Sequence, residues 1–218
     1  IRYLFRVVII SVFSMLLLTE VVSGQTTVDS VLNKKASALY EIAEQFWAAR
    51  NADSATYYYE LSIATYLSAK NWHETLSKEI RYANLLGRTG KNQQIIDRLS
   101  SALKLSDSLH LDTLRISNLL LERIAIAYDR IGRHTQAYNY FQSFLSYSKG
   151  GITRDSAYRD YIGKTYNNLA VSLMQSSRYE LADIYFDSAI LELDKQNLRN
   201  TEIEHVIYLN KGNVNRKL

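Results

Sequence analysis

The sequence predicts an all-α fold, an α-solenoid of antiparallel helix pairs, and three observations carry that prediction. Apolar residues recur at helical spacing, and no stretch shows the strict alternation that is typical of a strand. The 218 residues include no proline and only 8 glycines, so little interrupts a helix. A pattern of small and large side chains also returns at a regular interval, which indicates stacked repeats.

The repeated pattern is clearest within residues 166–191. Ala170 lies in one predicted helix, while Ala182 and Ala189 lie in the next with the large Phe186 between them. Small residues let two helix axes approach to about 8–10 Å, and a bulky side chain fills the adjoining groove. One such hairpin cannot bury its apolar face alone, so it needs neighbours of the same kind.

A register of 34 positions, with Ala170 at position 8, aligns four full copies of the pattern. The residues expected at the helix–helix contacts are Ala43, Ala55, Tyr59, Ala83, Leu99, Ala102, Ala125, Ala137, Phe141, Ala170, Ala182, Phe186, Ala189 and Gly212. The last of them belongs to a fifth copy, which begins at residue 205 and contains only its first helix. We therefore expect the chain to be truncated at its C-terminus.

Small side chains at positions 8, 20 and 27 and a large one at position 24 resemble the tetratricopeptide repeat (TPR) motif. The resemblance covers about residues 36–218. The copies start at residues 36, 76, 118, 163 and 205, so their spacing is 40 to 45 residues instead of 34. Positions 4 and 32 lack the family's Trp and Pro. Extra helical turns would explain the longer spacing and leave the fold class intact.

The first four helices are expected at residues 26–51, from about 52 to 70, 71–87 and 92–109. Residues 51–54 are polar and supply N-cap candidates for the second helix. Asp112 is a candidate cap for the fifth helix, which ends near Ile131.

The sixth helix is expected from His134 to about residue 149, because Gly150 and Gly151 form the clearest helix breaker in the chain. The seventh follows from about residue 155. Ser177 and Glu180 fit a capping box at the start of the eighth helix. The ninth begins near residue 200.

Residues 1–24 differ in kind from the rest, and they resemble a secretory signal peptide. Arg2 and Arg6 precede an apolar run over residues 7–18, and small residues surround Gly24, where cleavage is expected. A spanning helix needs about 20 apolar residues, and Glu20 interrupts this run. An uncleaved N-terminal anchor is the alternative. Both alternatives predict an exported chain, in the periplasm or on the outer side of the cell membrane, with residues 25–218 forming the TPR-like domain.

The net charge of +4 is mild, and basic residues are interleaved with Asp and Glu. We therefore predict no nucleic-acid partner for this segment, because a phosphate backbone demands a basic stripe. Without cysteine there is neither a disulfide framework nor a thiolate metal site. Contact with a membrane is expected only through an uncleaved N-terminal segment or a helix that follows residue 218.

The four histidines, His73, His110, His134 and His205, lack the spacing of a metal site, and we expect them to be solvated or to cap helices. No Gly-rich phosphate loop and no Gly-x-Ser-x-Gly turn is present. A Ser-His-Asp arrangement is assembled in space and leaves no fixed spacing to search for. We predict no enzyme and no cofactor.

The TPR resemblance implies that the first helix of each pair lines a concave groove. The residues at groove positions that could bind a peptide are Arg81, Asn84, Arg123, Arg130, Lys164, Asn167, Asn168 and Asn210. Arg, Lys and Asn can donate hydrogen bonds to a peptide backbone or carboxylate. The residue types are permuted relative to the family's carboxylate clamp, so a broader polar groove is expected.

These features predict a non-catalytic scaffold of the cell envelope that binds a protein or peptide. The alternative is the extracytoplasmic sensory region of a larger signal-transduction protein, with a histidine-kinase or helix-turn-helix output domain. The resemblance to TPR-containing sensors implies that alternative, and an output domain beyond residue 218 would distinguish it from the scaffold.

Overall fold

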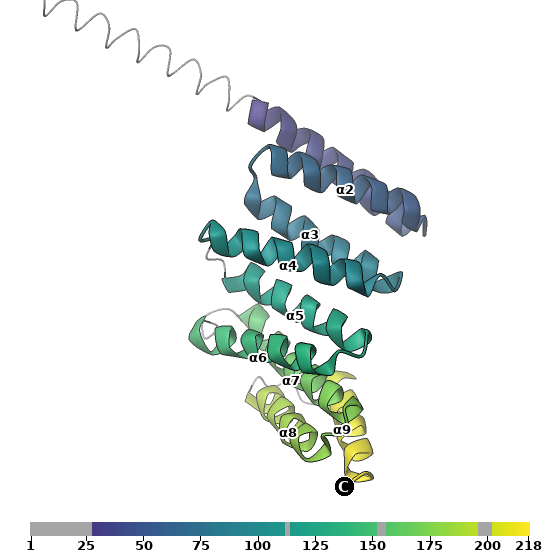
Figure 1. Cartoon of the computed structure of the whole chain (residues 1–218), viewed down its shortest axis with the longest axis vertical. Helices are drawn as coiled ribbons and strands as arrows, with labels where there is room; N and C mark the ends of the chain where they lie inside the picture. Colours follow the sequence, from purple (N-terminus) through teal and green to yellow (C-terminus); the bar gives the residue numbers. More distant parts are fainter. Residues whose placement is uncertain (1–27, 112–113, 152–155, 196–201) are drawn as a thin grey trace, which may run out of the picture. The chain divides into compact units, whose positions relative to one another are not determined.

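The computed structural model describes residues 28–111, 114–151, 156–195 and 202–218, and every regular element in these ranges is a helix (Figure 1). A first helix covers residues 28–48. It is followed by α2 (Ala52–Ser68), α3 (Trp72–Arg88), α4 (Asn92–Ser108), α5 (Leu114–Arg130), α6 (His134–Gly151), α7 (Ser156–Gln175), α8 (Tyr179–Lys195) and α9 (Glu202–Asn215). The predicted all-α repeat fold is confirmed. The predicted signal segment lies outside the described residues, as does the capping candidate Asp112.

The long repeat spacing comes from the helices themselves. α2, α3 and α4 have 17 residues each. With connections over residues 69–71 and 89–91, α4 begins 40 residues after α2. The later, longer spacings include residues 112–113 and 152–155, which the structure does not describe. Long helices, and not long loops, therefore set the interval between the first copies.

The chain divides into two compact units, the first ending at Lys78 and the second beginning at Glu79, within α3. In the first unit, the first helix packs against α2 through aromatic rings and a buried hydroxyl. The rings of Tyr40 and Tyr59 meet edge to face with centroids 5.8 Å apart. The buried Ser62 donates through Oγ to the Ala36 carbonyl oxygen at 2.7 Å. Because the hydroxyl is fully buried, this bond satisfies a group that would otherwise destabilise the pair.

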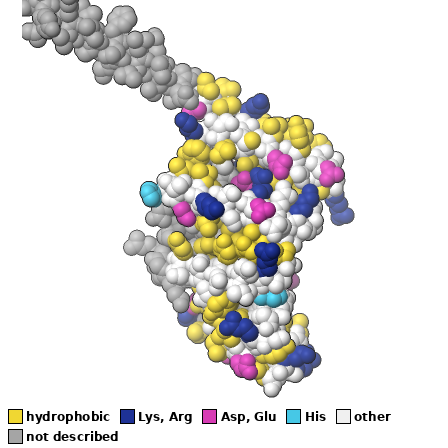
Figure 2. Space-filling view, in the orientation of Figure 1, with side chains coloured by type: hydrophobic (Ala, Val, Ile, Leu, Met, Phe, Trp, Pro, Cys, Tyr) yellow, Lys and Arg dark blue, Asp and Glu magenta, His cyan; other side chains and the backbone are white. Residues whose placement is uncertain are grey.

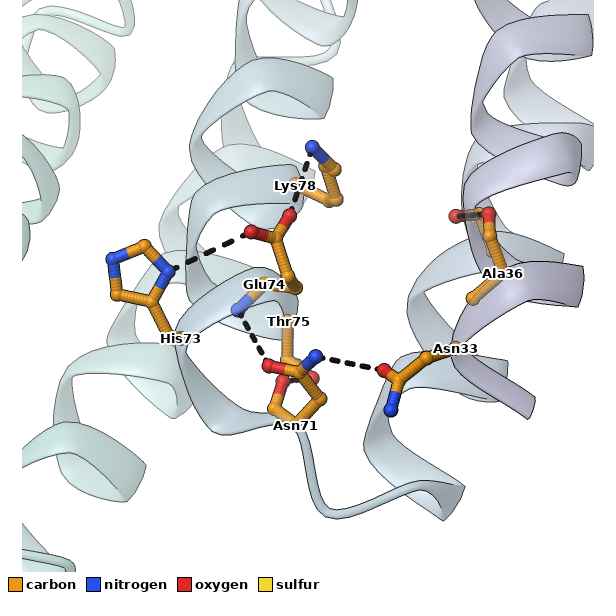
Figure 3. A network of polar contacts seen from close by, with 8 residues as sticks. Asn33, Ala36, Asn71, His73, Glu74, Thr75 and Lys78 are labelled. Atoms are coloured by element: carbon orange, nitrogen blue, oxygen red, sulfur yellow. Dashed lines mark hydrogen bonds and ion pairs between the residues drawn. The ribbon is translucent and has the colours of Figure 1, made fainter. Parts of the chain in front are cut away.

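A polar network at the start of α3 ties this helix to the first helix (Figure 3). Asn71 precedes α3, and its Oδ1 accepts the backbone N–H of Glu74 at 3.3 Å, as an N-cap residue does. Its Nδ2 donates to Asn33 Oδ1 at 2.7 Å. Lys78 Nζ lies 3.0 Å from Glu74 Oε2 and 4.1 Å from the centroid of the Tyr40 ring. One cap residue therefore fixes both the start of α3 and its contact with the first helix.

In the second unit each helix packs on the next from α4 to α9, and the first helices of successive pairs also meet, α5 with α7 and α7 with α9 (Figure 1). The core contains the predicted small and large residues. Across both units the buried members of the predicted set are Ala43, Ala55, Tyr59, Ala83, Leu99, Ala102, Ala125, Ala137, Phe141, Ala170, Ala182, Phe186 and Ala189. Gly212 differs, because it is exposed and an added Cβ would meet no atom within 4 Å. No described contact requires a small residue there.

Position 15 of the register closes the first helix of each pair in a left-handed conformation. The backbone φ is +59° at Arg50, +74° at Gly90, +76° at Gly132 and +61° at Ser177. The sequence shows this turn only where glycine occupies it, since arginine and serine carry no conformational signal. The turn is nevertheless the same in all four copies.

One sequence prediction about a helix end is wrong, namely the capping box at the start of α8. Ser177 does not cap α8: its N–H bonds to the Met174 carbonyl at the end of α7, and Arg178 is the residue before α8. Ser177 adopts the left-handed conformation that closes α7, so it cannot also serve as the N-cap of α8. The sixth helix is expected to end at the Gly150–Gly151 pair, and α6 does end at Gly151.

We expect opposite stability effects from exchanging residues at this turn. Gly132→Ala should lower the free energy of unfolding by about 1 kcal/mol, because a Cβ is strained at φ +76° even though nothing lies within 4 Å. Ser177→Gly should raise it by up to about 1 kcal/mol. Urea unfolding followed by circular dichroism measures both. The control is Gly212→Ala in the exposed interior of α9, which should stabilise the chain; a loss of stability there would contradict the conformational explanation.

Candidate functional site

The candidate site is the face formed by the first helices of successive pairs, α5, α7 and α9, here termed the first-helix face. It is defined by Arg123 on α5, Lys164, Asn167 and Asn168 on α7, and Asn210 on α9. The contacts of α5 with α7 and of α7 with α9 bring these residues onto neighbouring helices. Helical periodicity puts the three α7 residues within one turn, so the donors are closely spaced.

Asparagine side chains connect α7 to α9. Asn210 donates through Nδ2 to Asn167 Oδ1 at 3.3 Å. Asn167 in turn donates through Nδ2 to Asn168 Oδ1 at 3.5 Å, a long bond. Asn167 is only 7% exposed, so it orients its neighbours and is poorly placed to meet a ligand. Asn168 and Asn210 are half-buried and keep part of their surface open to solvent.

Between α5 and α7 lies a buried carboxyl group with two cations close to it. Glu122 is 4% exposed, and its Oε2 has no hydrogen-bond partner among the described residues. Burial raises the pKa of the Glu122 carboxyl, while the charges of Arg123 and Lys164 act in the opposite direction. Lys164 is exposed, with its Nζ 5.6 Å from the centroid of the Tyr161 ring. The Glu122 carboxyl therefore costs free energy when it ionises.

Further buried polar atoms on α5 and α7 lack partners. Asn118, one turn before Glu122 on α5, is fully buried with both amide atoms unpaired, and Thr165 on α7 is fully buried with Oγ1 unpaired. The buried Nε of Arg123 is also unpaired. Most buried polar groups in native proteins are hydrogen-bonded, and each that is not costs about 1–3 kcal/mol. Both α5 and α7 therefore carry buried polar atoms that have no partner among the described residues.

The predicted residues nearer the start of the second unit are less closely associated with this face. Arg130 at the end of α5 is exposed, and its Nη1 lies 3.5 Å from the Gly87 carbonyl oxygen on α3. Arg81 is exposed and Asn84 is half-buried on α3. Of the eight predicted groove residues, the structure brings Arg123, Lys164, Asn167, Asn168 and Asn210 together through neighbouring helices.

A serine, a histidine and an aspartate do meet, in an arrangement that differs from a hydrolase triad. His134 Nδ1 lies 2.8 Å from Asp129 Oδ1 and 3.5 Å from Ser172 Oγ. In a triad the serine bonds to the opposite ring nitrogen from the aspartate. Here both partners face Nδ1, and Ser172 is 1% exposed. The contacts therefore join α5, α6 and α7 as a structural network. Among the described residues no group of three or more His, Cys, Asp or Glu could hold a metal ion.

A cleft of about 550 Å³ lies at the C-terminal ends of α7 and α9. Its lining residues are Met174, Tyr179, Asn213, Arg216 and Lys217. Met174 and Tyr179 are partly buried against the hydrophobic core, and Arg216 and Lys217 are exposed. The sequence predictions omitted this cleft. A signal was present, because Arg216 and Lys217 occupy groove positions 12 and 13 of the fifth copy.

Charge elsewhere on the surface is mixed. Figure 2 shows basic and acidic side chains scattered over the face that it draws. None of the helices in the described ranges has the length and apolar character required to span a bilayer.

Comparison with known proteins shows the fold alone. No family model matches the sequence, and no curated protein matches it. Among solved structures, the apo form of RapI has a TM-score of 0.66 at 14% identity, over 87% of this chain and 74% of that one. TPR-like repeats of a putative kinesin light chain from Podosopora anserina have a TM-score of 0.66 at 12% identity. The match covers 84% of this chain and 87% of that one.

The TPR domain of Arabidopsis FLU has a TM-score of 0.50 at 18% identity, and it aligns with 57% of this chain and 98% of its own length. Together with the helix pairs and the buried repeat residues, these similarities define the class of protein: the chain has the fold of a TPR-type helical repeat.

Proposed function

We propose that this chain is a non-catalytic scaffold that binds an extended protein segment on the first-helix face. The observation that carries the proposal is the group of donors from three touching helices, Arg123, Lys164, Asn168 and Asn210. Such side chains can bond to the carbonyl oxygens or carboxylates of a peptide. Proteins often retain unfavourable polar groups at functional sites, and the unpaired atoms beside Arg123 support this location.

The function can be tested with peptides selected from a displayed random library on the intact chain. Replacing both Arg123 and Asn168 with alanine should lower the affinity for the selected peptide by about tenfold or more. Each hydrogen bond to a charged group is worth about 1.5–3 kcal/mol. Isothermal titration calorimetry measures the dissociation constant. The chain should remain folded, because neither side chain is fully buried.

Arg133→Ala combined with Asn139→Ala is the matched control, because it removes the same two residue types from exposed positions at and within α6, a second helix. This control should leave the dissociation constant unchanged. If the Arg123 and Asn168 variant binds as tightly as the native chain, the first-helix face is not the site.

The envelope location belongs to the same proposal and rests on the sequence of residues 1–24. A basic start followed by a short apolar run and small residues supports export. Fusing residues 1–30 to alkaline phosphatase, which is active only outside the cytoplasm, should yield active enzyme. A fusion that stays inactive would contradict the envelope location and leave the binding proposal standing.

A further inference from the structure

The cleft between the C-terminal ends of α7 and α9 combines apolar surface with uncompensated positive charge. Met174 and Tyr179 supply the apolar part, while Asn213, Arg216 and Lys217 supply polar groups. At about 550 Å³ the cleft falls within the range of sites that enclose small groups, about 300–1,000 Å³. None of these lining residues is an Asp or Glu.

The two cations of the cleft have no acidic partner within the described chain. Arg216 donates through Nη2 to Asn213 Oδ1, which orients the guanidinium and leaves other N–H groups of the fork for a ligand. Lys217 makes no side-chain ion pair or hydrogen bond with any described residue. By contrast, Lys211 on α9, six residues before Lys217, is held by Asp183 at 2.6 Å and Asp187 at 2.8 Å. Residues 211–217 therefore contain both a lysine neutralised by carboxylates and, just after α9, two cations without an Asp or Glu partner among the described residues.

The two acids of α5 are likewise buried or paired. Glu122 is buried, and Asp129 is bonded to His134. Arg123 and Lys164 remain as cations on the same set of helices as the cleft. Electrostatic complementarity then favours a negatively charged partner, since a cationic one would meet like charge.

We infer that the cleft binds an acidic peptide segment, with a carboxylate against Arg216 and Lys217 and an adjacent apolar or aromatic side chain on Met174 and Tyr179. This inference rests on the proposed function and narrows it, because it names the chemistry of the bound segment. Arg216 supplies a planar fork that matches a carboxylate, and Lys217 supplies a point charge. The apolar surface of Met174 and Tyr179 favours acidic segments in which an apolar or aromatic residue stands next to the carboxylate.

The test uses three labelled peptides, blocked at both ends and flanked by Gly-Ser repeats. Their central segments are Glu-Phe-Glu, Gln-Phe-Gln and Glu-Gly-Glu, and fluorescence anisotropy with the full chain measures each dissociation constant. Glu-Phe-Glu should bind most tightly, and each of the other two should bind about tenfold more weakly. Affinity for Glu-Phe-Glu should also fall as salt is added, because exposed charges are screened.

Reversing both cleft charges, Arg216→Glu with Lys217→Glu, should lower the affinity for Glu-Phe-Glu by about tenfold or more. Lys104→Glu with Arg133→Glu makes the same change in net charge at exposed positions outside the cleft and should have little effect. Equal binding of Glu-Phe-Glu and Gln-Phe-Gln, or an unchanged affinity of the cleft variant, would overturn the inference. So would an absence of binding at peptide concentrations up to about 1 mM.

The Arg123→Ala and Asn168→Ala variant separates this inference from the broader proposal. If Glu-Phe-Glu binding is lost in the cleft variant and kept in this one, the cleft binds the acidic segment without help from Arg123 and Asn168. If a library-selected peptide depends on Arg123 and Asn168 while Glu-Phe-Glu fails to bind, the first-helix face stands and the acidic cleft is wrong.

Discussion

Replacing Phe186 with alanine should lower the free energy of unfolding by about 3–5 kcal/mol. The ring is fully buried in the core cluster of the second unit, together with the small residues Ala170, Ala182 and Ala189. Its removal takes away the transfer free energy of the ring and leaves a cavity that closely packed helices can fill only in part. Urea unfolding followed by far-ultraviolet circular dichroism measures the loss.

Tyr147→Ala is the control for this prediction, because it deletes an aromatic ring of α6 that is 49% exposed. Its effect should stay within about 1 kcal/mol, as is usual for surface substitutions. If the free energy of unfolding falls equally in both variants, the loss of any aromatic ring, and not its position in the repeat, would explain the effect. That result would contradict the assignment of Phe186 to the core.

Substituting Glu122 with glutamine should make the chain more stable than the native one at neutral pH, and the difference should shrink as pH falls. Burial raises the pKa of Glu122 above its ordinary value of 4.5, so the folded chain holds this proton more strongly than the unfolded chain. Stability from the protonated form is fully present below pH 4.5 and is lost as pH rises through the folded pKa. Glutamine keeps the shape and removes the titration.

The measurement is the urea midpoint of the native chain and of Glu122→Gln between pH 4 and pH 8, with the difference plotted against pH. The effects of the other carboxyl groups cancel in the difference. Glu180→Gln, at an exposed position on α8, is the control for the exchange of a carboxyl group for an amide. A flat difference for Glu122→Gln would mean that Arg123 and Lys164 fully compensate the burial of the carboxylate.

Most of the fold could be predicted from the sequence, because stacked helix pairs depend on local periodicity and on residue size. Ala170, Ala182 and Phe186 are informative by their volume alone, and the structure buries all three. Gly90 and Gly132 also carry a signal for their turns, because glycine adopts a positive φ without strain. Arg50 and Ser177 did not mark theirs, since either residue adopts a positive φ only when packed neighbours impose it.

The candidate site could be predicted only in part. Asn168 and Asn210 followed from their register positions, and these positions do lie on touching helices. The burial of Glu122 and the pairing of Asp129 with His134 depend on how α5, α6 and α7 meet, and no spacing in the sequence encodes that distance. The same holds for the cleft at Arg216, which requires residues that are about 40 positions apart to converge.

By itself, then, the sequence determined the class of fold, the length of the helices and the residues that separate them, because each depends on periodicity and volume within one hairpin. Only the tertiary structure decided which charges stay available to a ligand. Lys211 and Lys217 are six residues apart, yet Asp183 and Asp187 neutralise Lys211, while Lys217 lines a cleft with no Asp or Glu among its lining residues. Solvation and pairing depend on neighbours from other helices, and those neighbours are set by packing.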